Sequence, residues 1–184
     1  MKRGLLLAYG LISTVAIFLS MWFLVDIKFS AILSLINLLF LGHLVYKEKI
    51  DKEILIAIFF ALIITSYYTY QYTSANYYIG KINLFPLIAW TTGLVFTRQI
   101  YKIFKEKNEK FAMYLLTILY LTILFCIEYI GYNIFKIQLA SNYPDLLGLG
   151  ILHGPIGMKA FYLSAGPVYV MITEYLLGNK KNKN

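Results

Sequence analysis

The chain has 184 residues, of which 60% are hydrophobic and 14% are charged, whereas a soluble domain usually carries about 25% charged residues. The formal net charge is +8, but Lys and Arg cluster in short segments between apolar runs, so we interpret this charge as setting membrane topology and exclude nucleic acid as a partner. A single cysteine and two histidines exclude an intrachain disulfide and a thiolate metal cluster, and we expect no metal and no other cofactor.

Apolar runs near the length of a membrane-spanning helix, about 20 residues, recur along the chain. They predict an all-α, polytopic integral membrane protein built as one six-helix transmembrane domain over residues 1–184. The six predicted helices cover residues 4–25, 29–46, 54–78, 82–104, 111–135 and 158–177. The first run is longer than the apolar part of a signal peptide, so we interpret it as a retained helix.

The distribution of positive charge predicts the orientation of the bundle. Most of the 17 basic residues fall at the two termini and in the segments "KEKIDKE" and "KEKNEK". These segments would share one side of the membrane. The positive-inside rule therefore predicts that both termini are cytoplasmic, and we expect the membrane to be a prokaryotic cytoplasmic membrane.

The predicted outer segment between the fifth and sixth helices, residues 136–157, is too long for a simple turn. It reads "KIQLASNYPDLLGLGILHGPIG", in which leucines are mixed with glycines and prolines that break regular structure. Such a segment is too apolar for a solvated linker. We expect it to pack back onto the helices as a lid or a re-entrant element.

Glu128 is the most informative polar residue, because it lies inside the fifth apolar run. At 1.5 Å of rise per residue, it is about 25 Å along the predicted helix, in the outer third of a core about 30 Å thick. An ionised carboxylate there costs a few kcal/mol, so Glu128 is a functional candidate. Asp145 and His153 in the long loop are the other candidate acid–base groups, and we predict that the three residues are catalytic. Each has an alternative role: helix-to-helix hydrogen bonding for Glu128, a Pro-containing turn for Asp145, and an exposed loop position for His153.

Other polar and aromatic residues are expected at the same depth. The segment "TSYYTYQYTSANYY" of the third predicted helix would place hydroxyl and amide groups on one helical face. The predicted substrate-binding residues are Tyr67, Tyr70, Gln71, Ser74, Asn83, Tyr129, Tyr132, Asn133, Asn142 and Tyr143. An aromatic belt at the membrane interface is an alternative explanation for the tyrosines.

This pattern predicts a membrane-embedded enzyme that acts on a lipid or isoprenoid by cyclisation, hydration or isomerisation, with Glu128 as the acid or base. The order "E-x-x-G", a loop rich in Gly, Pro and Tyr, and a Pro-kinked helix is loosely similar to small membrane enzymes of carotenoid and terpenoid tailoring, over about a quarter of the chain. The alternatives are a membrane subunit that binds or transports a small molecule such as a vitamin, and a structural or assembly protein. The expected partners are the lipid bilayer and a hydrophobic substrate, with a protein partner or a homo-oligomer as further options.

Overall fold

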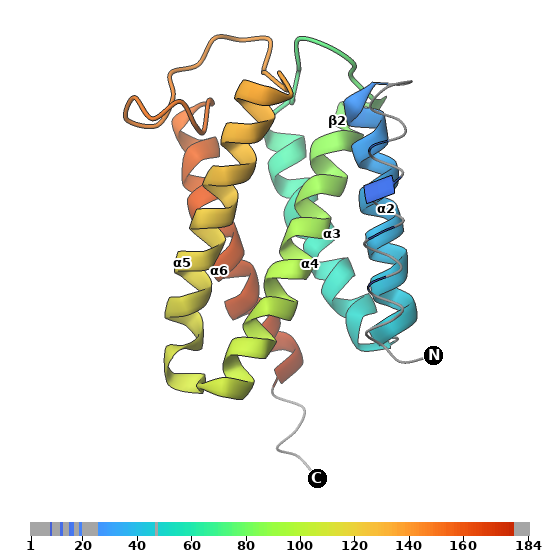
Figure 1. Cartoon of the computed structure of the whole chain (residues 1–184), viewed down its shortest axis with the longest axis vertical. Coiled ribbons are helices and arrows are strands. Elements are labelled where there is room, and N and C mark those ends of the chain that lie inside the picture. Colours follow the sequence, from blue (N-terminus) through green and yellow to red (C-terminus); the bar gives the residue numbers. More distant parts are fainter. Residues whose placement is uncertain are drawn as a thin grey trace. The chain divides into compact units, whose positions relative to one another are not determined.

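The computed structural model describes residues 8, 12, 15, 16, 19, 26–46 and 48–178. This part of the chain contains five α-helices, one short π-helix and a two-stranded antiparallel sheet, which confirms the prediction of a mostly helical protein. The first predicted helix, residues 4–25, lies outside the continuously described residues. The chain divides into two compact units, residues 1–93 and 94–184. Figure 1 shows the described helices and strands with their labels.

The first unit is built on two helices that pack against each other, α2 (Ile27–Tyr46) and α3 (Glu48–Tyr67). Helix α2 begins after Asp26, whose carboxylate accepts the backbone N–H groups of Lys28 at 2.8 Å and Phe29 at 3.3 Å. This contact satisfies two of the N–H groups that a helix start leaves without a partner. The buried apolar residues of this unit include Ile32, Leu41, Ile50, Ala57, Ala61, Ile64 and Tyr70.

The predicted helix at residues 54–78 is wrong at both ends, because α3 begins at Glu48, inside the predicted loop "KEKIDKE", and ends at Tyr67. The following residues form an irregular loop, in which Asn76 bonds the backbone of Tyr72 twice. Its Oδ1 accepts the Tyr72 N–H at 2.9 Å, and its Nδ2 donates to the Tyr72 carbonyl at 3.1 Å. Such local bonds compete with helix formation, which explains why an apolar and aromatic sequence leaves the helix here.

A short hairpin follows this loop and delays the start of the fourth predicted helix. Strands β1 (Tyr78–Ile79) and β2 (Ile82–Asn83) are antiparallel, and Gly80 in the turn between them has φ +61°. Glycine at the first position of a two-residue hairpin turn is typical of type II′. Helix α4 (Leu84–Lys107) therefore starts after β2 and not at Ile82.

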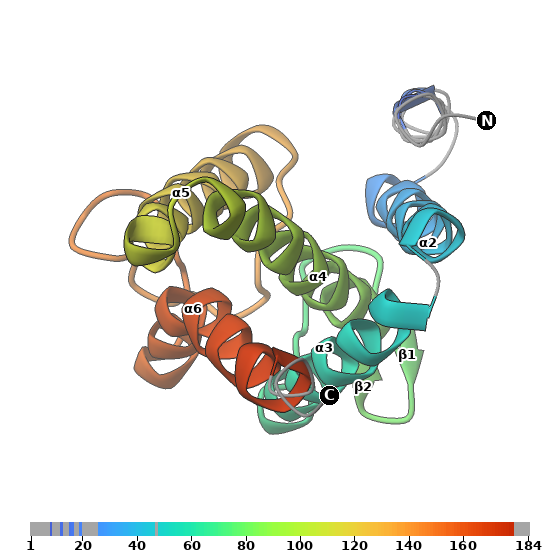
Figure 2. The ribbon, with the colours of Figure 1, turned by 90° about the horizontal axis from the view of Figure 1, so that it is seen from below.

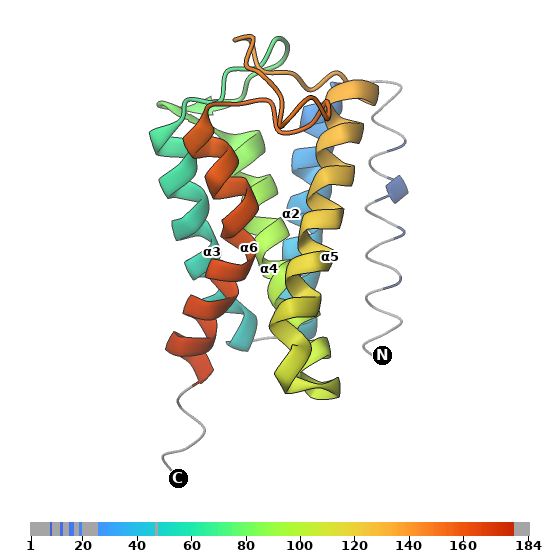
Figure 3. The same cartoon turned by 90° about the vertical axis from the view of Figure 1, so that its left-hand side faces the viewer.

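The second unit contains the rest of α4, then α5 (Glu109–Tyr129) with its π-helical extension η1 (Ile130–Ile134), and α6 (Ile156–Gly178). Only Asn108 separates α4 from α5, so the predicted loop "KEKNEK" is mostly helical. Helices α5 and α6 are packed neighbours, as the view from below in Figure 2 shows. The long segment before α6 connects their upper ends (Figure 3).

Among the described residues, two helical stretches are long and apolar enough to cross a membrane, Glu109–Ile134 and Ile156–Leu177. Helix α2 is apolar over the shorter range Ile27–His43. Only 11% of the apolar window in the first stretch is buried, and 28% in the second. A core helix of a soluble protein would be buried all round. The two stretches are weak evidence for a membrane protein, and the six-span bundle and its orientation stay predictions.

Candidate functional site

The predicted site residues fall into two sets, one in each compact unit. The set in the first unit is Tyr67, Tyr70, Gln71, Ser74 and Asn83. The set in the second unit is Glu128, Tyr129, Tyr132, Asn133, Asn142, Tyr143, Asp145 and His153. Convergence of the two sets on one cavity stays a prediction, and each set is interpreted within its own unit.

In the first unit, buried members of the set hold the loop onto the hairpin. Tyr70 and Asn83 are each 1% exposed. The Tyr70 carbonyl accepts Asn83 Nδ2 at 2.8 Å and the Tyr78 hydroxyl at 3.1 Å. These residues therefore stabilise the irregular backbone, a role that the predicted helical face did not include. Tyr67 and Gln71 are exposed.

A buried lysine that the sequence analysis did not select joins the same loop to α2. The Lys28 ammonium donates to the backbone carbonyl of Ser74 and, at 3.3 Å, to its hydroxyl. It also lies 4.6 Å from the centre of the Tyr72 ring, which gives a cation–π contact. The sequence feature that could have pointed to Lys28 is Asp26, two residues earlier. Its carboxylate caps α2 and places a negative charge beside Lys28.

In the second unit, Glu128 lies in the last turn of α5 and is half-buried. It makes no hydrogen bond and no ion pair with any residue that the structure describes. A carboxyl group that tied two helices together would need such a partner. Tyr132 follows one turn later, inside η1, and π-helical turns are frequent at functional sites.

The rings of Tyr132 and His153 stack, with centroids 3.6 Å apart and planes at 6°. His153 Nδ1 is buried and has no hydrogen-bond partner within the described part of the chain. Burial lowers the pKa of His153, and the nearby Asp145 carboxylate opposes this effect. A neutral imidazole is therefore favoured near pH 7.

Asp145 uses both carboxylate oxygens to organise the loop. Oδ1 accepts the Gly148 N–H at 3.1 Å, and Oδ2 accepts the Gly150 N–H at 2.6 Å. The hydrogen bond from Gly150 is the main reason that the pKa of Asp145 is lowered. These contacts explain the residue as part of a turn, while its catalytic role stays a prediction.

The remaining predicted residues of the second unit lie in η1, at the end of α5 and in the loop before α6. Asn133 Nδ2 donates to the Tyr129 carbonyl at 3.1 Å and to the Gly150 carbonyl at 3.4 Å, so it joins η1 to the loop. Tyr129 is 53% exposed. Asn142 is exposed and Tyr143 is half-buried.

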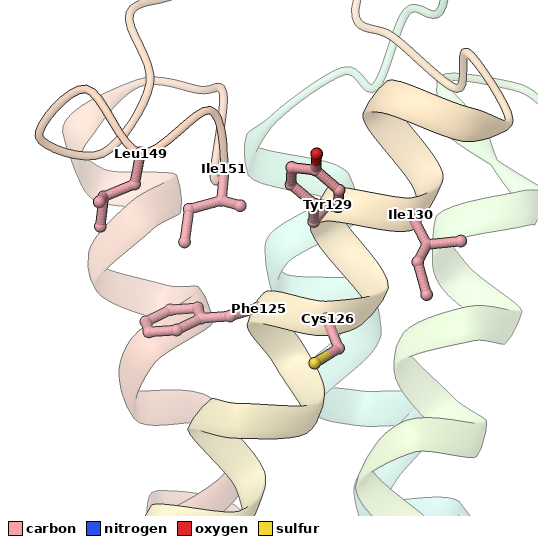
Figure 4. Close-up of a pocket in the computed structure, with 6 residues that line it drawn as sticks. All are labelled: Phe125, Cys126, Tyr129, Ile130, Leu149 and Ile151. Carbon is pink, nitrogen blue, oxygen red and sulfur yellow. The ribbon is translucent and has the colours of Figure 1, made fainter.

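A shallow, open apolar hollow of about 460 Å³ lies at the loop end of α5 (Figure 4). It is lined by Phe125, Cys126, Tyr129, Ile130, Leu149 and Ile151. In Figure 4 the side chains of Leu149 and Ile151 extend from the loop toward the turn of α5 that carries Phe125. The side chains that line the hollow have only two polar atoms, the Tyr129 hydroxyl oxygen and the Cys126 sulfur, so the hollow suits a hydrocarbon group. Glu128 belongs to the same stretch of α5 but is not a lining residue.

A charged cluster at the other end of the second unit was also missed. Arg98, whose side chain is 5% exposed, pairs with Glu174, and Lys105 Nζ lies 2.6 Å from the second oxygen of that carboxylate. The sequence analysis did not select Arg98 or Glu174. The cluster joins α4 to α6 and is interpreted as structural.

Within the described residues, no group of three His, Cys, Asp or Glu side chains is placed to hold a metal ion. Comparison of the chain with protein-family models, curated proteins and solved structures gives no match. The interpretation of the site therefore rests on its own residues.

Proposed function

We propose that this chain is a multi-pass membrane protein, with cytoplasmic termini, that acts on a lipid or isoprenoid by acid–base chemistry. The exposed surface of α5 supports the membrane location, since Ile118, Ile127 and Ile134 are 48%, 62% and 60% exposed. Exposed aromatic residues stand near both ends of this surface, with Phe111 at one end and Tyr129 at the other. They are about 27 Å apart along the helix axis, close to the thickness of a hydrocarbon core.

The hollow supports a hydrophobic substrate over a water-soluble one. Sites for polar small molecules usually combine apolar walls with several convergent polar groups. The lining of this hollow offers only the Tyr129 hydroxyl and the Cys126 thiol. A hydrocarbon chain fits such a lining better than a vitamin with several hydrogen-bonding groups.

The observation that carries the reaction type is the stack of Tyr132 on His153. The stack holds the half-buried His153 imidazole, whose buried Nδ1 has no hydrogen-bond partner in the described residues, two positions after Ile151 of the hollow. Glu128 lies one turn before Tyr132 and makes no hydrogen bond or ion pair within the described residues. Two groups that can exchange a proton therefore belong to the end of the unit that holds the apolar hollow.

An isomerisation illustrates how the two groups would act. Glu128 would give a proton to one carbon of a double bond, which leaves a cation on the other carbon, and His153 would remove a proton from the next carbon along the chain. The double bond moves, and the substrate neither gains nor loses atoms. Transfer of the proton from the imidazolium back to the carboxylate would restore the starting state, so this reaction needs no cofactor.

The test is mass spectrometry of the lipids and small molecules that the purified protein retains, for wild type and Glu128→Gln. Glu109→Gln is the matched control, since Glu109 lies at the start of the same helix with its side chain 76% exposed. We expect wild type and the control to retain one defined lipid or isoprenoid, and Glu128→Gln to retain a precursor with the same carbon skeleton. Retention of the same hydrophobic molecule by all three proteins would contradict the role of Glu128. A retained water-soluble ligand would favour the transport subunit.

A further inference from the structure

We propose that the segment of residues 145–151, called here the leucine loop, inserts its apolar side chains into the lipid layer beside α5 and α6. The proposal rests on the membrane location but not on the proposed reaction.

The apolar side chains of the leucine loop fall into a buried group and an exposed group. Ile151 is 6% exposed and packs inward, whereas Leu147 is 89% exposed and Leu149 is 58% exposed. Ile156, at the start of α6, adds a further side chain that is 87% exposed.

The exposed leucines are held outward by a bonded framework. The Asp145 carboxylate accepts the N–H groups of Gly148 and Gly150, and the Leu146 N–H donates to the Ile151 carbonyl at 2.8 Å. Leu147 has φ +56°, a left-handed conformation that is unfavourable for a residue with a β-carbon. A loop free to bury its leucines would relax this conformation, so the framework fixes Leu147 in its exposed position.

Two backbone carbonyl groups at the start of the leucine loop accept hydrogen bonds from one side chain. Lys159 Nζ donates to the carbonyl oxygens of Pro144 at 2.8 Å and Asp145 at 2.9 Å. Because an unsatisfied backbone group is costly near hydrocarbon, these bonds lower the cost of bringing the loop into the lipid layer.

Lipid is the occupant because the loop continues the membrane-facing surface of α5. Leu149 belongs both to the exposed part of the leucine loop and to the lining of the apolar hollow, whose other wall is α5. In Figure 1 the segment before α6 spreads sideways beside the upper ends of α5 and α6. Its exposed leucines therefore lie at the same end of the unit as Tyr129, which is expected at the membrane interface.

The test uses nitroxide labels on single cysteines in the full chain, reconstituted into vesicles of phosphatidylcholine and phosphatidylglycerol. The background is Cys126→Ser, which removes the only native cysteine. Labels at Leu147→Cys and Leu149→Cys are compared with Ser141→Cys, an exposed polar position before the leucine loop, and Ile118→Cys, an exposed position in the middle of α5. Accessibility to oxygen reports lipid, and accessibility to a water-soluble nickel complex reports water.

We expect the ratio of oxygen to nickel accessibility at Leu147 and Leu149 to be several-fold higher than at Ser141 and close to that at Ile118. If the two leucine positions match Ser141 while Ile118 faces lipid, the leucine loop lies in water and the proposal is overturned. Low accessibility to both reagents at the leucines would mean that protein covers them, for example a second copy of the chain, and would also overturn it. If Ile118 itself faces water, the membrane location of the proposed function fails as well.

Discussion

Tyr132 and His153 lie face to face with their ring centroids 3.6 Å apart, and this contact joins the π-helical end of α5 to the loop before α6. The stack fixes the position of the imidazole relative to the turn of α5 that carries Glu128. It also shields one face of the ring, while Nδ1 stays buried without a partner among the described residues. The geometry of the proposed site therefore depends on an aromatic contact between two residues far apart in the sequence.

Replacing Tyr132 with leucine should loosen this end of the second unit, and replacing it with phenylalanine should not. The stack is worth about 0.5–1.5 kcal/mol beyond area burial, and Phe keeps the ring while Leu removes it. Hydrogen exchange followed by mass spectrometry should show faster exchange around His153 in Tyr132→Leu only. Equal exchange in both variants would show that the stack does not hold the loop.

The loop around His153 should open as the pH falls below about 6.5. Burial lowers the folded-state pKa of His153 below the ordinary value of 6.5, so between these two values the unfolded chain binds more protons. The contribution of His153 to stability is therefore complete above about pH 6.5 and is lost as the pH falls through the folded value. The Asp145 carboxylate favours the charged imidazole and Lys159 disfavours it, so both groups set the midpoint.

Hydrogen exchange of the loop at several pH values, corrected for intrinsic rates, checks this prediction. The control is His153→Gln, which should lose the step nearest neutrality and keep the one that comes from Asp145 at lower pH. The pKa of Asp145 is lowered by its backbone hydrogen bonds, so its contribution is lost only when the pH falls through that lowered value. An unchanged profile in His153→Gln would assign the whole effect to other groups.

Asp145→Asn should loosen the leucine loop without unfolding the helices. An amide side chain has a single acceptor oxygen, so it cannot hold the N–H groups of both Gly148 and Gly150 as the carboxylate does. We expect faster exchange of these two amides, with the amides of α5 and α6 unchanged. Ser141→Ala, at an exposed position outside this framework, serves as the matched control and should behave like wild type.

Continuous apolar runs predicted the starts of α2 and α6 well. Helix α2 starts at Ile27 and α6 at Ile156, each two residues before its predicted start. The end of α3 was missed because the Asn76 side chain bonds the Tyr72 backbone, and no pattern of hydrophobicity records such a bond. Local side-chain chemistry, and not composition, ended this helix.

The parts of the site that depend on contacts between distant residues were less predictable. Glu128 was selected from its depth alone, which a single helix defines. The hollow needs Leu149 and Ile151 to fold back against Phe125, and the sequence does not specify that path. The burial of Arg98 was missed for the same reason, since its partner Glu174 lies on α6.

Gly166→Ala should destabilise the packing of α5 on α6. A β-carbon at Gly166 would lie 2.5 Å from the ring of Tyr120, whose hydroxyl donates to the Tyr162 carbonyl at 2.5 Å and so restricts the ring. Overpacking of this kind costs about 1–3 kcal/mol. Gly93→Ala is the control, because nothing lies within 4 Å of a β-carbon there and alanine favours a helix. Thermal unfolding in detergent should rank Gly93→Ala above Gly166→Ala, and equal melting temperatures would refute the contact.

The two cations that share Glu174 should contribute unequally to stability. The Arg98 side chain is 5% exposed, whereas the Lys105 side chain is 37% exposed, so only the arginine loses most of its hydration. Glu174→Gln leaves a buried guanidinium without its carboxylate and should cost about 3–5 kcal/mol, the range for breaking a buried ion pair. Lys105→Gln removes a solvated partner and should cost at most about 1 kcal/mol, because water screens it. Thermal unfolding of the two variants in the same detergent checks the order, and a similar loss in both would mean that the carboxylate is stabilised mainly by the exposed lysine.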